Sequence, residues 1–124
     1  MKWLLLFLGG GIGASLRFAL ATFVDERAPE TFPWGTFAVN AAGCFAIGLL
    51  ATFSDEHHWL SPGARLFLVA GLLGGFTTFS TYGFETWQLI EDGAAAGALA
   101  YAVGSVAVGL VAVVFGALIA RQLG

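Results

Sequence analysis

The stretch GGFTTFSTYGFE, residues Gly74–Glu85, decides how the rest of this chain is interpreted. It combines a glycine pair, a run of hydroxyl side chains, aromatic rings and a carboxylate within a segment that otherwise has the composition of a membrane-spanning helix. Hydrocarbon penalises unsatisfied polar groups, so a polar run at membrane depth usually lines a path that the protein encloses. The functional question is therefore what passes along this stretch.

The composition is that of an integral membrane protein. Of the 124 residues, 58% are hydrophobic and 10% are charged, and the mean hydropathy is +0.85. A soluble domain has roughly 25% charged residues. The single cysteine, Cys44, has no partner for a disulfide within the chain. The five basic residues form no patch, which argues against binding to nucleic acid.

The apolar segments predict four transmembrane helices. A spanning helix needs about 20 mostly apolar residues, and four stretches meet this requirement: 3–24, 33–53, 63–90 and 94–120. Tryptophans near the ends of these stretches are typical of the membrane interface: Trp3, Trp34, Trp59 and Trp87. We therefore predict an all-α integral membrane protein in which residues 1–124 form a single four-helix domain, with the third helix broken near its middle.

Basic residues give only a weak orientation signal. Four spans place both termini on one side of the membrane, together with Lys2, Arg65 and Arg121. The other side has Arg27, and also Arg17 if its head extends outward. Orientation follows the excess of basic residues near helix ends. A chain with so small an excess is expected to insert both ways, and two opposed copies could then form an antiparallel dimer.

The glycine pair Gly74–Gly75 has two interpretations. Glycine weakens a helix and permits a local break, and the carbonyl oxygens that a break frees could bind a cation. Alternatively, the glycines form a kink, and the hydroxyls of Thr77 and Thr78 satisfy the freed backbone groups.

Beyond the glycines, helical periodicity places Thr78, Thr81, Tyr82 and Glu85 on one face, with Phe79 at its margin. Ring edges are positive, so together with hydroxyl protons they could replace part of the hydration shell of an anion. The alternative is that the rings pack the core and the hydroxyls bond to the preceding turn.

Three further polar residues lie within predicted spans. Asn40 could join helices or contact an anion. Arg17 could extend to the interface or draw anions into a vestibule. A carboxylate such as Glu85 is costly in a membrane and would repel anions, so we expect it near the mouth of a path or protonated. No catalytic or nucleotide-binding motif is present, and no enzyme activity is predicted.

These residues together resemble the Fluc (CrcB) family of fluoride channels. Gly9–Arg17 is similar to the family's GGxxGAxxR signature, Gly35–Gly43 to its GTxxVNxxG pattern, and Gly74–Thr81 to its GGxTTFST motif. Tyr101 and Ser105 fit its fourth helix. The resemblance covers essentially the whole chain. Tyr82 is a departure, since the family usually has a second phenylalanine there, and its hydroxyl would add a donor to the path.

The resemblance implies a dual-topology antiparallel homodimer in the cell membrane that passively exports fluoride. Phe79 and Tyr82 would form an aromatic ladder, and the other residues of the fluoride path would be Asn40, Ser80, Thr81, Tyr101 and Ser105. A structural sodium ion would lie at the dimer centre, bound by the backbone carbonyls of Gly74 and Thr77. The implied partners are a second copy of the chain, fluoride and membrane lipid.

Two other functions remain as alternatives. A small proton-coupled multidrug exporter also packs four short helices into an inverted dimer. That mechanism needs a membrane-embedded carboxylate, characteristically in the first helix, and the first acidic residue here is Asp25. A membrane scaffold without transport activity would not need the run of hydroxyls and rings.

Overall fold

The computed structural model describes residues 1–124 and is helical throughout, apart from short connections. Four helical spans are long and apolar enough to cross a membrane, and the chain is a multi-pass membrane protein. The helices are α1 (Lys2–Asp25), α2 (Trp34–His57), α3 (Pro62–Arg65), η1 (Leu66–Leu73), α4 (Gly74–Phe76), α5 (Ser80–Glu91) and α6 (Ala95–Leu123). The third span consists of α3, the π-helical segment η1, α4 and α5. Its interruption between α4 and α5 confirms the predicted break.

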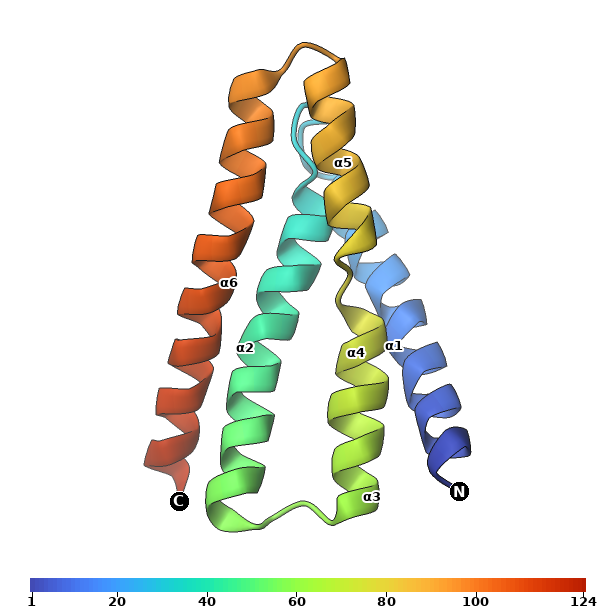
Figure 1. Ribbon diagram of the computed structural model, residues 1–124, viewed down its shortest axis with the longest axis vertical. Coiled ribbons are helices and arrows are strands. Elements are labelled where there is room, and N and C mark those ends of the chain that lie inside the picture. The colour runs from blue at the N-terminus through green and yellow to red at the C-terminus, as the bar shows by residue number, and fades with distance from the viewer.

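The spans form two closely packed pairs (Figure 1). The α2 helix packs along α6, and α1 packs along η1 and α4. After the break, α5 leaves α1 and packs against α6. Both termini lie at the same end of the molecule as the α2–α3 connection (Figure 1). The opposite end contains the α1–α2 and α5–α6 connections.

Glycines allow both pairs to approach closely. A Cβ atom on Gly9 would lie 2.6 Å from the carbonyl oxygen of Phe67, and one on Gly13 would collide with the carbonyl of Leu72. In the other pair, Gly48 and Gly116 leave the same kind of room between α2 and α6. Small residues are a general means of helix packing in membranes, because apolar lipid removes most of the hydrophobic drive to associate.

The α2 helix is longer than the sequence predicted. Residues 54–57, which we expected in a connector, continue the helix to His57. Two ion pairs stabilise this extra turn: Asp55 pairs with Arg65, and Glu56 Oε1 lies 2.8 Å from Arg121 Nε. Arg121 is far away in the sequence and Arg65 lies beyond the α2–α3 connection, so the local polarity of residues 54–57 gave no sign of the helical turn. His58 then ends the helix with a left-handed φ of 50°.

Large apolar side chains cover the outside of the molecule. Many exposed ones lie on α1 and α6, including Phe7, Phe18, Leu110 and Phe115. Only a small set of residues is fully buried, with Tyr101 and Val39 the largest among them. This distribution suits a protein whose surroundings are lipid rather than water.

Candidate ion path

The break in the third span lies at Thr77–Phe79, and not at the glycine pair. Thr77 is extended, with φ −87° and ψ 157°, whereas Gly74 and Gly75 are helical. The predicted place of the break was therefore wrong by a few residues. Gly75 is needed for close packing and not for the break, since a Cβ atom there would collide with the backbone of Gly10 on α1.

Two other helices satisfy three of the backbone groups that the break exposes. From α2, Asn40 Nδ2 donates to the Thr78 carbonyl at 3.0 Å, and Asn40 Oδ1 accepts from the Thr78 N–H at 2.9 Å. From α1, Arg17 Nη1 donates to the Thr77 carbonyl at 3.3 Å. An unsatisfied backbone group in a membrane costs several kcal/mol. Asn40 and Arg17 therefore stabilise the interrupted backbone, which is a role that sequence reasoning did not assign to Arg17.

A cavity of about 420 Å³ lies beside the break. It brings together four of the predicted path residues, Asn40, Phe79, Tyr82 and Ser105, and it also includes Gly74 and both threonines of the break. Most of its remaining lining is apolar. The Ser105 Oγ atom is buried and has no hydrogen-bond partner. Buried polar groups are normally paired, so a free hydroxyl next to a cavity indicates a place for a ligand or water.

Aromatic rings continue from this cavity into the protein. The Phe79 and Tyr82 rings are stacked, with centroids 5.5 Å apart and an interplanar angle of 22°. Tyr82 in turn lies 5.4 Å from Tyr101, which lies 5.3 Å from Phe32. Sequence reasoning missed Phe32, which precedes α2 in a connection and has no motif to mark it. The Tyr82 hydroxyl donates to the carbonyl of Ala102 at 2.8 Å.

A second cavity of about 360 Å³ lies on the α1 side of the break. Arg17, Thr36, Thr78 and Thr81 contribute to its lining. Thr78 therefore borders both cavities, and its hydroxyl donates to the Thr81 hydroxyl at 3.1 Å. Thr36 was not among the predicted path residues, although it lies in the Gly35–Gly43 motif. Ser80, which was, is exposed and lines neither of these two cavities.

Glu85 lies towards the end of the molecule that contains the α1–α2 connection. Its Oε1 atom accepts a hydrogen bond from the Tyr101 hydroxyl at 3.3 Å. It also borders a cavity of about 330 Å³ whose lining includes three more carboxylates: Asp25, Glu30 and Asp92. Asp25 has a structural role as well, because its Oδ1 atom accepts from the Gly35 N–H at the start of α2 at 2.8 Å.

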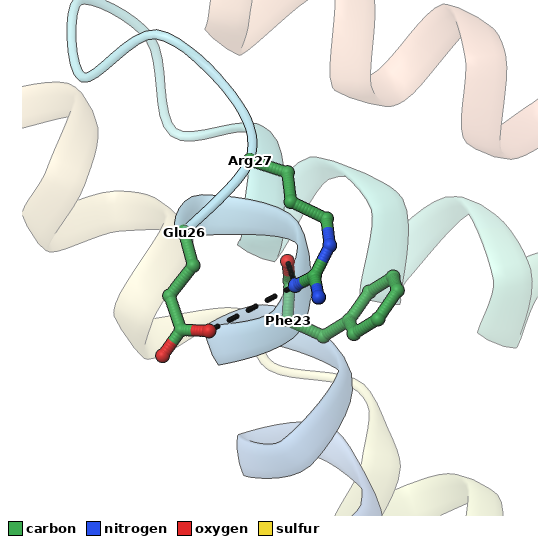
Figure 2. A network of polar contacts seen from close by, with 3 residues as sticks. All are labelled: Phe23, Glu26 and Arg27. Atoms are coloured by element: carbon green, nitrogen blue, oxygen red, sulfur yellow. Dashed lines mark hydrogen bonds and ion pairs between the residues drawn. The ribbon is translucent and has the colours of Figure 1, made fainter.

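The basic residue closest in sequence to this acidic end is held against its own helix (Figure 2). Arg27 Nη1 donates to the Phe23 carbonyl at 2.9 Å, and the guanidinium lies 3.7 Å from the centroid of the Phe23 ring. Glu26 Oε2 is 3.8 Å from the same nitrogen. A cation over a ring face is attracted by the ring quadrupole. Arg27 thus caps the end of α1 and leaves the adjacent cavity with an acidic lining.

The backbone oxygens at the break suit a small cation. The N–H of Thr78 donates to Asn40, so the Gly74 carbonyl lacks the partner that a continuous helix would provide. The Thr77 carbonyl already accepts from Arg17. A carbonyl oxygen has two lone pairs, so Thr77 can accept this bond and contact a cation as well. Backbone carbonyl oxygens are the kind of ligand that a sodium site uses, and the free Gly74 carbonyl fits this chemistry, whereas the positive charge of Arg17 beside the Thr77 carbonyl opposes a cation there.

The fold and this site define a small multi-pass membrane protein whose third span is interrupted between two cavities. The chain belongs to the family described as CrcB-like protein, Camphor Resistance (CrcB), which it matches over residues 4–117. It is 48% identical over 122 residues to a protein of Solibacter usitatus named fluoride-specific ion channel FluC, with 98% of this chain and 100% of the relative covered. Relatives with the same name in Chloroflexus aurantiacus and Acidobacterium capsulatum are 46% and 41% identical, over 94% and 99% of this chain and 93% and 98% of their own lengths.

Proposed function

We propose that this chain forms a fluoride-selective ion channel, and not an enzyme, through which fluoride leaves the cytoplasm passively across the cell membrane. The observation that carries the proposal is the buried, unpartnered hydroxyl of Ser105, in the cavity that the Phe79 and Tyr82 rings also line. Hydroxyl protons and ring edges are the positive ends of their dipoles and quadrupoles. They can replace water around a small anion without a fixed charge that would hold it too tightly.

Passive export is sufficient for this task. Hydrogen fluoride is a weak acid that crosses membranes as the neutral molecule and dissociates inside, which traps the anion. An inside-negative potential then drives the anion outward with about 2.3 kcal/mol per 100 mV. A selective path is all that is needed, and the named relatives support fluoride as the ion.

The conducting unit is an antiparallel homodimer of the single domain 1–124. Phe79 is 74% exposed in the isolated chain, and Gly74 beside it is exposed too. One copy therefore leaves the path residues of the break uncovered, and a second copy in the opposite orientation covers them. The weak bias of basic residues permits both orientations, and lipid surrounds the remaining apolar surface.

Sodium joins the two copies at the dimer centre. The Gly74 and Thr77 carbonyls of both chains hold it, and its positive charge compensates the carbonyl dipoles that the two breaks bring together. The free Gly74 carbonyl described above supports this site.

The proposed path uses residues from three helices. Phe79 and Tyr82 supply the rings, and Ser105, Thr81 and Tyr101 supply hydroxyls. Ser80, at the exposed start of α5, contributes only near the surface. Asn40 holds the backbone of the break at Thr78, and its second amide proton is available to the ion. Arg17 draws anions into the cavity on the α1 side, and Glu85 lies towards the mouth at the acidic end.

Efflux from liposomes tests this function. Purified protein should release fluoride much faster than chloride and should retain a cationic dye. Release of the dye with a proton gradient would instead indicate the multidrug exporter, and no release of any solute would indicate a scaffold.

A pair of variants tests the path itself. Phe79→Ile keeps a bulky apolar side chain and removes the ring, so fluoride flux should fall severely while the dimer persists. Phe84→Ile makes the same change at an exposed α5 position outside the cavity and should keep normal flux. Undiminished flux in Phe79→Ile would exclude this path.

A further inference from the structure

The Tyr82 hydroxyl is bonded to α6 and is not free to contact an ion. It donates its only proton to the Ala102 carbonyl at 2.8 Å. We propose that Tyr82 is a positioning residue: through this bond α6 fixes the ring on which Phe79 stacks, and loss of the hydroxyl from this chain lowers, without abolishing, its selectivity for fluoride. This inference rests on the proposed channel function.

The geometry of a tyrosine explains what the bond can fix. The hydroxyl oxygen lies on the axis about which the ring flips, so a flip leaves the hydrogen bond intact. Pivoting of the whole ring about the Cα–Cβ bond would move the oxygen away from Ala102 and break it. The bond therefore fixes the direction of the ring axis, which is the coordinate that determines how the ring lies against Phe79.

Within one copy of the chain, Tyr82 is the aromatic ring against which Phe79 is placed. It lies in the break and has no regular helix before it, and its side chain is 74% exposed. Its one stacked aromatic neighbour in the chain is Tyr82, at 5.5 Å. The Ala102 carbonyl on α6 thus fixes the Tyr82 ring, and the Tyr82 ring in turn fixes the Phe79 ring.

The surroundings make the hydroxyl necessary for this positioning. No residue of α5 is fully buried within one copy of the chain, so packing inside that copy holds this helix weakly. Hydrogen bonds tie it to α6 at two points, from Tyr82 to Ala102 and from Tyr101 to Glu85. The Tyr82 ring also borders the cavity of about 420 Å³. Without the bond to Ala102, the ring has space into which it can pivot.

The experiment compares fluoride and chloride flux in liposomes for the full chain and its variants. Tyr82→Phe keeps the ring and removes the hydroxyl. Because a typical hydrogen bond shifts a population by about 2- to 10-fold, we expect the ratio of fluoride to chloride flux to fall by about that factor. Dimer yield and thermal stability should stay close to those of the unmodified protein, since the ring and its stacking surface remain.

A matched control removes another hydroxyl from the same helix. Thr86 Oγ1 donates to the Tyr82 carbonyl at 2.8 Å, a bond within α5 that does not reach α6. Thr86→Val should leave the flux ratio unchanged. Two further variants separate donor from shape: Tyr82→4-aminophenylalanine restores a donor at the para position and should restore the ratio, whereas Tyr82→4-methylphenylalanine restores only bulk and should not.

Each outcome bears on a distinct statement. If the unmodified protein releases no fluoride, the channel function itself fails. If it releases fluoride and Tyr82→Phe has the same flux ratio, the positioning role is overturned and the channel function stands. Rescue by 4-methylphenylalanine, or loss of the dimer in Tyr82→Phe without rescue by 4-aminophenylalanine, would show that Tyr82 acts through packing, which also overturns the proposal.

Discussion

Asn40 and Thr78 are joined by a reciprocal pair of hydrogen bonds, one in each direction between the side-chain amide and the backbone. The amide thus takes the place that a neighbouring residue would have in a continuous helix. A substitution of Asn40 therefore alters two things at once, the backbone of the break and the lining of the cavity.

Asn40→Asp should abolish or severely reduce fluoride flux and should also destabilise the folded protein. The ionised carboxylate cannot donate to the Thr78 carbonyl and is repelled by it, and an unsatisfied buried group costs about 1–3 kcal/mol. Thermal unfolding of the purified protein measures the loss. A protonated aspartic acid has one donor and one acceptor, so the stability deficit should shrink at acidic pH. A deficit that grows on acidification would contradict this pairing.

Gly13→Ala should prevent normal folding or dimer formation. The new Cβ atom would collide with the Leu72 carbonyl. The atoms nearest to it belong to the backbone of the third span, which has little freedom to adjust. Gly11→Ala is the matched control on the same helix, since a Cβ atom there meets nothing within 4 Å. Helix propensity favours alanine over glycine by about 1 kcal/mol, so the control should be neutral or slightly more stable. The yield of monodisperse protein after purification distinguishes the two.

Removal of charge from the acidic end should speed fluoride entry. Glu30→Gln and Asp92→Asn each neutralise a carboxylate that borders the cavity near Glu85. We expect higher fluoride flux at low ionic strength and a vanishing difference at high ionic strength, because the Debye length falls from about 30 Å at 0.01 M to about 3 Å at 1 M. Glu26→Gln removes the same charge outside this cavity and should have a smaller effect. An effect independent of salt would argue against an electrostatic cause.

Reporter fusions at the carboxyl terminus should be active on both sides of the membrane. Both termini lie at the same end of the fold (Figure 1), so one fusion reports the orientation of a whole copy. Extra lysines next to Lys2 should shift the population towards one orientation and lower fluoride flux, since fewer antiparallel pairs form. A single orientation in the unmodified protein would contradict the proposed dimer.

Composition and motif order were enough to predict the four spans and an interrupted third helix. Apolar length determines a span, and that property is local to the sequence. The position of the break was misplaced, because glycine is permissive rather than decisive, and the backbone departs from the helix where Asn40 and Arg17 supply partners. Those contacts join residues that are far apart in the chain, and no local pattern encodes them.

Only some residues of the candidate path could be predicted, because contacts between residues that are far apart in the chain leave no local pattern in the sequence. Asn40, Phe79, Tyr82 and Ser105 carry recognisable motif positions and meet at one cavity. Thr36 and Phe32 come close to the path only because α2 and its preceding connection pack against Tyr101 and α5. The hydroxyl of Tyr82 was expected to add a donor to the path, whereas its proton is bonded to Ala102.

The two side chains that satisfy the break both precede it in the chain, Arg17 on α1 and Asn40 on α2. A ribosome therefore completes both before it makes Thr77 and Thr78. When the third span leaves the translocon, its Thr77 and Thr78 carbonyls meet partners that are already in the bilayer, and only the Gly74 carbonyl has to wait for a partner from outside the chain. A circular permutant that begins at the third span would reverse this order, so it should be inserted less efficiently even though its final contacts could be the same.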